Sequence, residues 1–183
     1  MKKSLMLLVV LVILLGNVAC STYAANRYAI SVDTQELLRK NTSNKVNVGE
    51  FTSVDEGATS LACRGVGPIK TPDGETFDAY VRKALVDELR MADLFSADGP
   101  VTLTGTLDAI EFSSTEGSWD LMLTVRSSNG NSLAVKEHYD FSSSFFGETA
   151  CNQTAQTLMP AVQNLIGKLV KDPSFRGLLR KER

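Results

Sequence analysis

The chain has 183 residues, of which 43% are apolar, with 19 basic and 21 acidic side chains and a net charge of −2. This length suits one ordinary domain that buries its own core. Nucleic-acid binding needs a basic surface, so the slightly acidic balance gives no electrostatic basis for it, and we expect no nucleic-acid partner.

The first residues have the three parts of a secretory signal peptide. Lys2 and Lys3 give a positive start, an unbroken apolar run covers residues 5–15, and small residues follow. A membrane-spanning helix needs about 20 apolar residues, and this run is much shorter. We therefore predict that residues 1–19 are a signal peptide and that the protein is exported.

The end of the signal allows two outcomes. Val18-Ala19-Cys20 resembles the lipobox of bacterial lipoproteins, which implies that Cys20 receives a lipid and becomes the first mature residue. Ser21 resembles the usual sorting signal for the outer membrane, so we expect a lipid anchor there, on the periplasmic side. The alternative is cleavage after Ala24, in the small-x-small pattern Thr22-Tyr23-Ala24, which would release a soluble periplasmic protein.

Cysteine use follows from export. Whether Cys20 is lipidated or removed, Cys63 and Cys151 remain, in a compartment that oxidises thiols. We predict a Cys63–Cys151 disulfide, with two independent buried thiols as the alternative. Closing a loop of roughly 90 residues would stabilise the fold by on the order of 4–5 kcal/mol in the chain-entropy model.

Residues 20–44 are expected to be the lipid anchor and a tether, ahead of a single domain over residues 45–183. Within this segment, residues 33–38 can begin a short helix, because Asp33 or Thr34 suits its first turn. Residues 28–32 alternate weakly and could instead form an edge strand.

The domain begins with alternating patterns. Residues 45–53 are predicted to be a strand, with a bulge at Gly49-Glu50. Residues 54–74 are rich in Gly and Pro and are expected to be a long connection that the disulfide pins. Arg64-Gly65-Val66-Gly67, within it, lacks the Lys and Ser/Thr of a phosphate-binding loop.

Two long amphipathic helices are expected. Apolar residues recur at three- and four-residue steps over residues 73–95 and again over residues 148–170. Pro160 lies inside the second, where it predicts a kink or two helices that meet. The basic tail, residues 171–183, is expected to be solvated, with contact to membrane headgroups as the alternative.

Between the helices, three strands are predicted over residues 101–109, 119–126 and 133–141. Asn129-Gly130 joins the last two and favours a tight hairpin turn. Glu137 falls on the apolar side of the third strand, and we expect it near an edge of the sheet, where it can reach water.

These elements predict an α+β domain. The expected architecture is a four-stranded, mostly antiparallel sheet in the order β-α-β-β-β-α, with the two long helices packed on one face. This arrangement buries every apolar face at once. The other face of the sheet would be polar, either solvated or a surface for a partner.

One pattern extends over residues 45–180: Phe77 to Leu89 precede Gly99-Pro100-Val101, and Asn152 to Val170 precede Asp172, Ser174 and Phe175. It resembles the YajG type of small envelope lipoproteins of Gram-negative bacteria. The wider group includes lipoproteins that assist lipopolysaccharide assembly and auxiliary lipoproteins of ABC transporters. The resemblance implies an accessory or scaffold role with an envelope protein partner and without a defined reaction.

Candidate catalytic residues are few. His138 is the only histidine, and a Ser–His–Asp arrangement would have to combine it with Asp140 or Asp120, without a nucleophile-elbow motif nearby. One histidine and two paired cysteines do not make a zinc site, and we expect no metal or cofactor. Paired carboxylates for glycosidic hydrolysis are available only as acids near strand ends, which are typical of solvated turns: Asp108 with Glu111, and Asp120 with Glu116.

Phe145 and Phe146 stand between the last strand and the last helix, where they are expected to close the end of the core. If exposed, they are a candidate contact for a partner or an acyl chain. Three functions are therefore weighed. The leading one is a non-enzymatic outer-membrane lipoprotein that supports an envelope complex; the others are a periplasmic binding module for a lipid or glycan, and a hydrolase.

Overall fold

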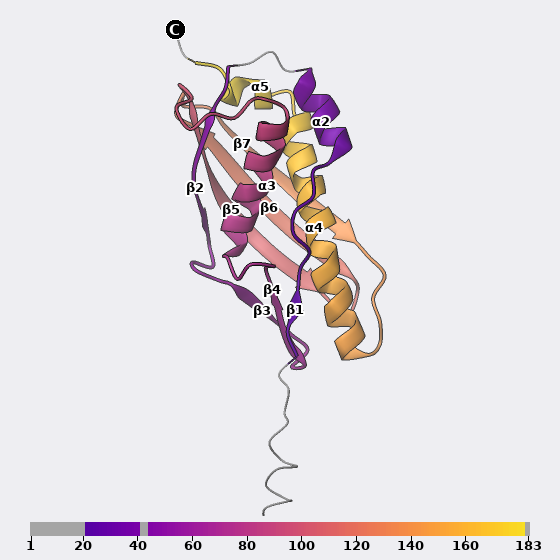
Figure 1. Ribbon diagram of the computed structural model, residues 1–183. Coiled ribbons are helices and arrows are strands. Elements are labelled where there is room, and N and C mark those ends of the chain that lie inside the picture. The colour runs from indigo at the N-terminus through magenta and orange to yellow at the C-terminus, as the bar shows by residue number, and fades with distance from the viewer. Residues whose placement is uncertain (1–20, 41–43, 182–183) are drawn as a thin grey trace, which may run out of the picture.

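The structure, a computed structural model, describes residues 21–40 and 44–181 (Figure 1). The described residues form these elements in chain order: β1 (Tyr23–Ala24), α2 (Val32–Arg39), β2 (Asn47–Ser53), β3 (Ser60–Cys63), β4 (Gly67–Lys70), α3 (Phe77–Met91), β5 (Thr102–Ser113), β6 (Ser118–Ser127), β7 (Ser132–Asp140), α4 (Gly147–Lys171) and α5 (Phe175–Leu178).

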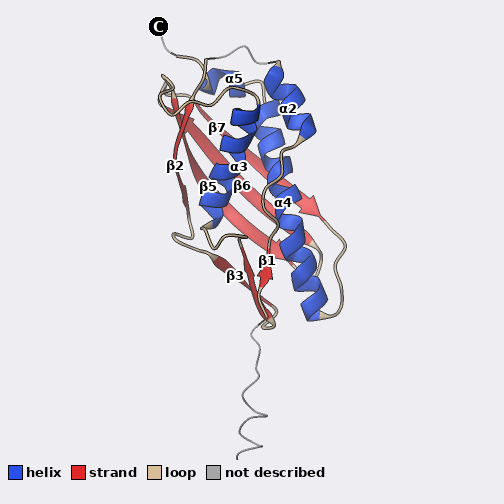
Figure 2. Ribbon diagram, viewed as in Figure 1, coloured by secondary structure: helices blue, strands red, loops and turns tan. Residues whose placement is uncertain are grey.

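The larger sheet has the strand order β2-β5-β6-β7. β2 runs parallel to β5, and the other neighbours are antiparallel. α3 and α4 lie side by side on one face of this sheet (Figure 2). The predicted β-α-β-β-β-α core, with both long helices on one face, is confirmed.

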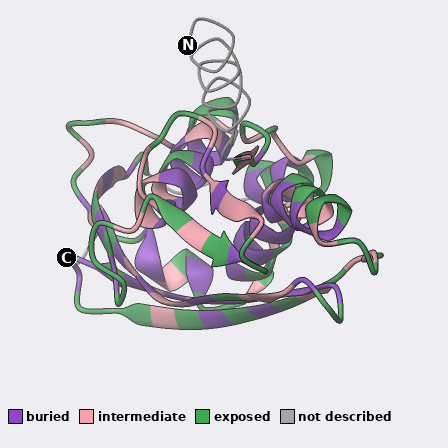
Figure 3. Ribbon diagram, turned by 90° about the horizontal axis from the view of Figure 1, so that it is seen from below, coloured by how far each residue is buried: buried purple, intermediate pink, exposed green. Residues whose placement is uncertain are grey.

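The core lies between this sheet and the two helices. Leu103, Leu107 and Leu123 are fully buried, while their neighbours along the strands are more exposed. Figure 3 shows buried and more exposed positions alternating along the sheet. Trp119 is also fully buried, and its indole N–H donates to the backbone carbonyl of Thr154 in α4 at 3.0 Å. This bond gives the indole nitrogen the partner that a buried tryptophan needs.

The long connection over residues 54–74 is not an irregular loop, as expected, but contains a second sheet. β3 and β4 form an antiparallel hairpin, and β1 pairs with β4 in parallel. The single-sheet prediction is therefore incomplete. Sequence reasoning missed these strands because each has four residues or fewer, which is too short for an alternating pattern to stand out.

Much of the segment assigned to a tether is packed against the domain. Residues 33–38 lie within α2, as predicted, whereas residues 28–31 form no strand. The carboxylate of Glu88 in α3, which is completely buried, holds this segment. It accepts hydrogen bonds from the Tyr28 hydroxyl at 2.7 Å, the Ser31 backbone N–H at 2.7 Å and the Gln35 side-chain amide at 2.5 Å. Burial, together with the nearby carboxylate, raises the pKa of Tyr28, so the phenol remains a donor.

The expected solvated tail is also packed. α5 buries Phe175 and Leu178 completely or nearly so. The Asn129 side-chain amide donates to the backbone carbonyls of Gly177 at 2.8 Å and Arg180 at 2.6 Å. The solvated-tail prediction is wrong for residues 171–181, because apolar residues spaced within the short basic stretch find room at the end of the sheet.

Three local predictions have definite outcomes. The register of β2 shifts between Val48 and Phe51, so the predicted bulge is confirmed. The hairpin around Gly130 is confirmed, but only Gly130 of the expected pair has a positive φ, of 85°. α4 continues through Pro160 as one helix rather than as two helices that meet.

The predicted disulfide is present. Cys63 in β3 is bonded to Cys151 in α4, with their Cα atoms 5.9 Å apart and a sequence separation of 88. Both cysteines are buried. The bond attaches the smaller sheet to the beginning of α4.

Replacing Glu88 with alanine should destabilise the fold by about 2 kcal/mol or more, because it leaves the Tyr28 hydroxyl and the Ser31 N–H without their acceptor, and each buried unsatisfied group costs about 1–3 kcal/mol. The Gln35 amide keeps its 2.9 Å bond to the backbone carbonyl of residue 88. Urea unfolding under non-reducing conditions measures this loss. Asp87→Ala is the matched control on the same helix; it removes only a 3.9 Å surface ion pair with Arg90 and should cost less than about 1 kcal/mol. Equal stabilities of the two variants would contradict the role of Glu88.

Removing the disulfide by the double substitution Cys63→Ala and Cys151→Ala should lower the free energy of unfolding by about 4–5 kcal/mol, because the unfolded chain is no longer constrained by a long closed loop. Adding a reductant should destabilise the unsubstituted protein by a similar amount and leave the double variant unchanged. Non-reduced peptide mapping that finds both thiols free would contradict the pairing.

Candidate functional site

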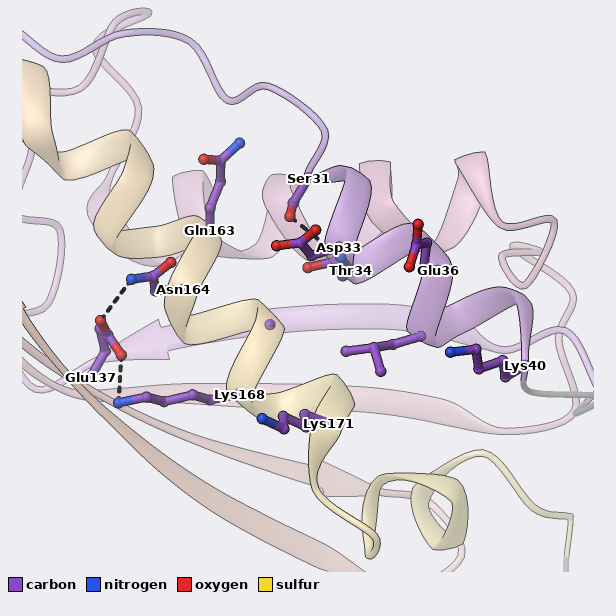
Figure 4. A pocket seen from close by; sticks show the side chains of 12 residues that line it. Ser31, Asp33, Thr34, Glu36, Lys40, Glu137, Gln163, Asn164, Lys168 and Lys171 are labelled. Atoms are coloured by element: carbon purple, nitrogen blue, oxygen red, sulfur yellow. Dashed lines mark hydrogen bonds and ion pairs between the residues drawn. The ribbon is translucent and has the colours of Figure 1, made fainter.

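A groove of about 470 Å³ lies between α2 and α4, above the edge strand β7. α2 contributes one wall and α4 the other, and Glu137 of β7 forms the floor (Figure 4). All lining residues except Leu37 and Gly167 are polar or charged. The lining consists of Ser31, Asp33, Thr34, Glu36, Leu37, Lys40, Glu137, Gln163, Asn164, Gly167, Lys168 and Lys171. The helices come close at Gly167, where a Cβ atom would lie 3.5 Å from the Thr34 hydroxyl.

Glu137 is the most constrained residue of this groove. It is only 4% exposed, so the expectation that it reaches water at the sheet edge is wrong. Its carboxylate instead forms a 2.6 Å ion pair with Lys168 and accepts a 3.1 Å hydrogen bond from the Asn164 amide. Both partners come from α4, which covers the edge strand and compensates the buried charge.

The groove is lined by side chains of both charges. Acidic side chains from α2 face basic side chains from α4 and the end of α2, so the charges are roughly balanced. Hydroxyl, amide and charged groups line the groove, and such groups can form hydrogen bonds with a polar ligand. Leu37 is the only large apolar side chain in the lining, and the aliphatic stems of the charged side chains add further apolar surface.

His138 lies on the opposite, open face of the sheet, in a row that crosses three strands. Glu111 pairs with Asp120, and Asp120 pairs with His138, in the register of β5, β6 and β7. The two imidazole nitrogens face carboxylates: Nδ1 lies 2.6 Å from Asp120 and Nε2 lies 3.1 Å from Asp140. The hydrogen bond to Asp120 is the main reason that the pKa of His138 is raised.

This geometry does not make a general base. A base needs one free ring nitrogen beside a nucleophile, and both nitrogens of His138 are engaged by carboxylates. The imidazole instead links β7 to Asp120 of the neighbouring strand β6. The sequence anticipated both aspartates as its neighbours, but not that they would bind it at the same time.

The carboxylate pairs considered for hydrolysis are not assembled as pairs. Asp108 accepts a 2.6 Å hydrogen bond from the Thr124 hydroxyl. Asp120 is engaged by His138, and its cross-strand neighbour is Glu111 rather than Glu116. Asp108 and Asp120 therefore bind other side chains rather than the carboxylates expected as their partners.

Phe145 and Phe146 do not close the core, contrary to the expectation. They are 95% and 73% exposed and lie just before the first residue of α4. Their rings meet edge to face, with centroids 6.0 Å apart. The core ends instead at residues of α4 and β6 such as Ala150 and Trp119, which are fully buried.

Cys20 and the signal peptide lie outside the described residues. Across residues 21–40 and 44–181, no three His, Cys, Asp or Glu side chains are grouped so that they could hold a metal ion. Within the same part of the chain, none of the helices has the length and apolar character needed to cross a membrane.

Comparison with known proteins gives a likeness of fold. No protein-family model matches the chain, and no curated protein matches it. The crystal structure of protein XCC0632 from Xanthomonas campestris, of the family DUF330, is similar with a TM-score of 0.52. The two are 11% identical, and the similarity covers 82% of this chain and 95% of that one. At this identity the comparison shows a shared fold.

The groove was missed because its two walls come from distant parts of the sequence. The sequence predicts a short helix over residues 33–38 but places it in a tether, so it gives no indication that this helix packs against α4. The position of Glu137 on the apolar face of its strand could have indicated the groove, since a buried carboxylate requires a partner from a neighbouring element.

The raised pKa of His138 should be visible by NMR titration of its ring protons, above the ordinary value of 6.5. The ion pair stabilises the folded state fully below that value, and its contribution is lost as the pH rises through the higher pKa of the folded protein. Asp120→Asn should lower the pKa clearly, because Asp120 makes the larger contribution, and Asp140→Asn should lower it less. Equal, unshifted titration curves in all three proteins would contradict this arrangement.

Proposed function

We propose that this protein is an outer-membrane lipoprotein that faces the periplasm, is anchored by a lipid on Cys20, and acts without catalysis as an accessory or scaffold for an envelope complex. The observation that carries this proposal is the packing of the residues directly after Cys20. Tyr23 and Ala24 form β1, and the Ala25 backbone N–H donates to Lys70 at 2.8 Å. Cleavage after Ala24 would remove β1 from the fold.

Tight packing around Ser21 supports the same choice of cleavage site. A Cβ atom on Gly67 would overlap the Ser21 carbonyl, so the chain at residue 21 lies directly against β4. Because the folded domain begins immediately after the lipidation site, an acylated protein would sit close to the bilayer. A domain held in this way is suited to presenting a fixed surface to a partner.

The disulfide supports the proposed export, and the exposed face of the sheet supports the proposed non-catalytic role. A buried Cys63–Cys151 bond is typical of a protein that folds in an oxidising compartment. The polar face of the sheet, where both ring nitrogens of His138 face aspartates, would offer a partner surface rather than a reactive centre. The resemblance to YajG-type lipoproteins agrees with an accessory role and remains part of this proposal.

A second candidate is a periplasmic binding module, favoured by the groove between α2 and α4. Its hydroxyl, amide and charged groups could satisfy the many hydrogen bonds that a glycan makes. Such a module could be anchored or soluble. Crosslinked pulldown from the envelope distinguishes the candidates, because a scaffold recovers a protein partner and a binding module recovers its ligand.

Cys20→Ala should abolish labelling by radioactive palmitate and move the protein from the outer-membrane fraction to the soluble periplasm, because no other residue supplies the anchor. Ala24→Leu is the matched control. It blocks the competing cleavage site and should leave labelling and membrane location unchanged. An N-terminal sequence that begins at Ala25 in the unsubstituted protein would contradict the proposal.

A further inference from the structure

The exposed pair Phe145 and Phe146 forms an apolar projection on the protein surface. Scattered single apolar residues on a surface are normal, but two adjacent phenylalanines that are 95% and 73% exposed form a patch that needs a function. The patch stands at the end of a connection from β7, immediately before α4.

Arg64 holds the backbone beneath this patch. Its guanidinium donates to the carbonyls of Ser144 and Phe145, both at 3.2 Å. It also donates to the hydroxyl and carbonyl of Ser114, at 2.9 and 2.5 Å. The two carbonyls that would otherwise be exposed near the rings are therefore satisfied, and the aromatic side chains point outward from a fixed support.

The patch lies at the end of the molecule where the chain leaves toward Cys20. Ser21 is against Gly67, as described above, and a Cβ atom on Gly147 would lie 3.3 Å from the Val66 side chain. The β3–β4 turn thus touches both the first described residue and the residue after Phe146. Figure 1 shows β1, the β3–β4 hairpin and the start of α4 at one end, with α2 and α5 at the other.

We propose that Phe145 and Phe146 insert into the interfacial region of the bilayer that holds the lipid anchor. This inference rests on the proposed lipidation of Cys20. Aromatic rings are favourable at the level of lipid headgroups, and an anchor at the same end keeps them within reach of that layer.

Two attachments at one end orient the molecule in a way that a single flexible anchor does not. With the aromatic patch in the bilayer, the opposite end of the domain faces the periplasm. The groove between α2 and α4 lies toward that end, because α2 forms one of its walls. The groove and the open face of the sheet would then remain accessible to a periplasmic partner or ligand.

The test uses the full-length lipidated protein, reconstituted into vesicles of phosphatidylethanolamine and phosphatidylglycerol. Phe145→Trp places a fluorophore in the patch, and Val32→Trp places one at an exposed position, 73% accessible, on α2 at the other end. Trp119 is buried in both proteins and supplies the same background. Phospholipids brominated on their acyl chains quench only fluorophores that enter the bilayer.

The emission added by Phe145→Trp should be quenched several-fold more strongly by brominated lipid than the emission added by Val32→Trp. Aqueous acrylamide should give the reverse order. Equal behaviour of the two variants, with acrylamide reaching both, would overturn the insertion. Protection of the Phe145→Trp fluorophore in native envelopes but not in vesicles would also overturn it and indicate a protein partner.

Intact mass of the purified protein separates the two proposals. If Cys20 is acylated and the Phe145→Trp fluorophore stays in water, only the insertion is overturned. If Cys20 carries no lipid, the proposed function is overturned first, and the insertion is overturned with it. Phe145→Ser combined with Phe146→Ser should remove the membrane contact while leaving the thermal midpoint nearly unchanged, since exposed substitutions rarely alter stability.

Discussion

The bond between Cys63 and Cys151 joins the two sheets of the molecule through the longest helix, which packs on the larger sheet. It attaches the smaller sheet, which includes the strand nearest the proposed anchor, to the beginning of the longest helix. Arg64 follows Cys63 directly and reaches the backbone of Ser144 and Phe145. The covalent link therefore places the N-terminal strand, the arginine and the exposed phenylalanines at one end of the domain.

At the other end, a buried carboxylate has a comparable role without a covalent bond. Glu88 accepts hydrogen bonds from Tyr28, Ser31 and Gln35, and so holds α2 beside α3 and α4. One wall of the polar groove consists of α2, so this groove depends on an interaction with a residue that does not line it. The N-terminal segment is thus part of the domain along most of its described length.

Because the described domain begins at residue 21, a lipid on Cys20 would restrain the orientation of the domain as well as its location. A domain on a long flexible tether samples many orientations, whereas a domain that begins immediately after its lipidated residue is held close to the bilayer. The proposed aromatic contact would reduce the remaining freedom. Under this proposal two surfaces would face the periplasm: the groove with Glu137 at its floor, and the sheet face with His138 between two aspartates. Both suit recognition of a partner or a polar ligand.

The amino-acid sequence by itself determined the central β-α-β-β-β-α arrangement, because long alternating strands and long amphipathic helices have periods that a single chain displays. It also predicted the cysteine pairing, since the predicted export would leave Cys63 and Cys151 as the remaining thiols. Only the tertiary structure decided the short strands β1, β3 and β4, the docking of α2 and α5, the burial of Glu137 and the exposure of Phe145 and Phe146. Each of these depends on contacts between residues far apart in the chain, such as Glu88 with Tyr28 or Lys168 with Glu137, and such contacts leave no periodic pattern in either segment.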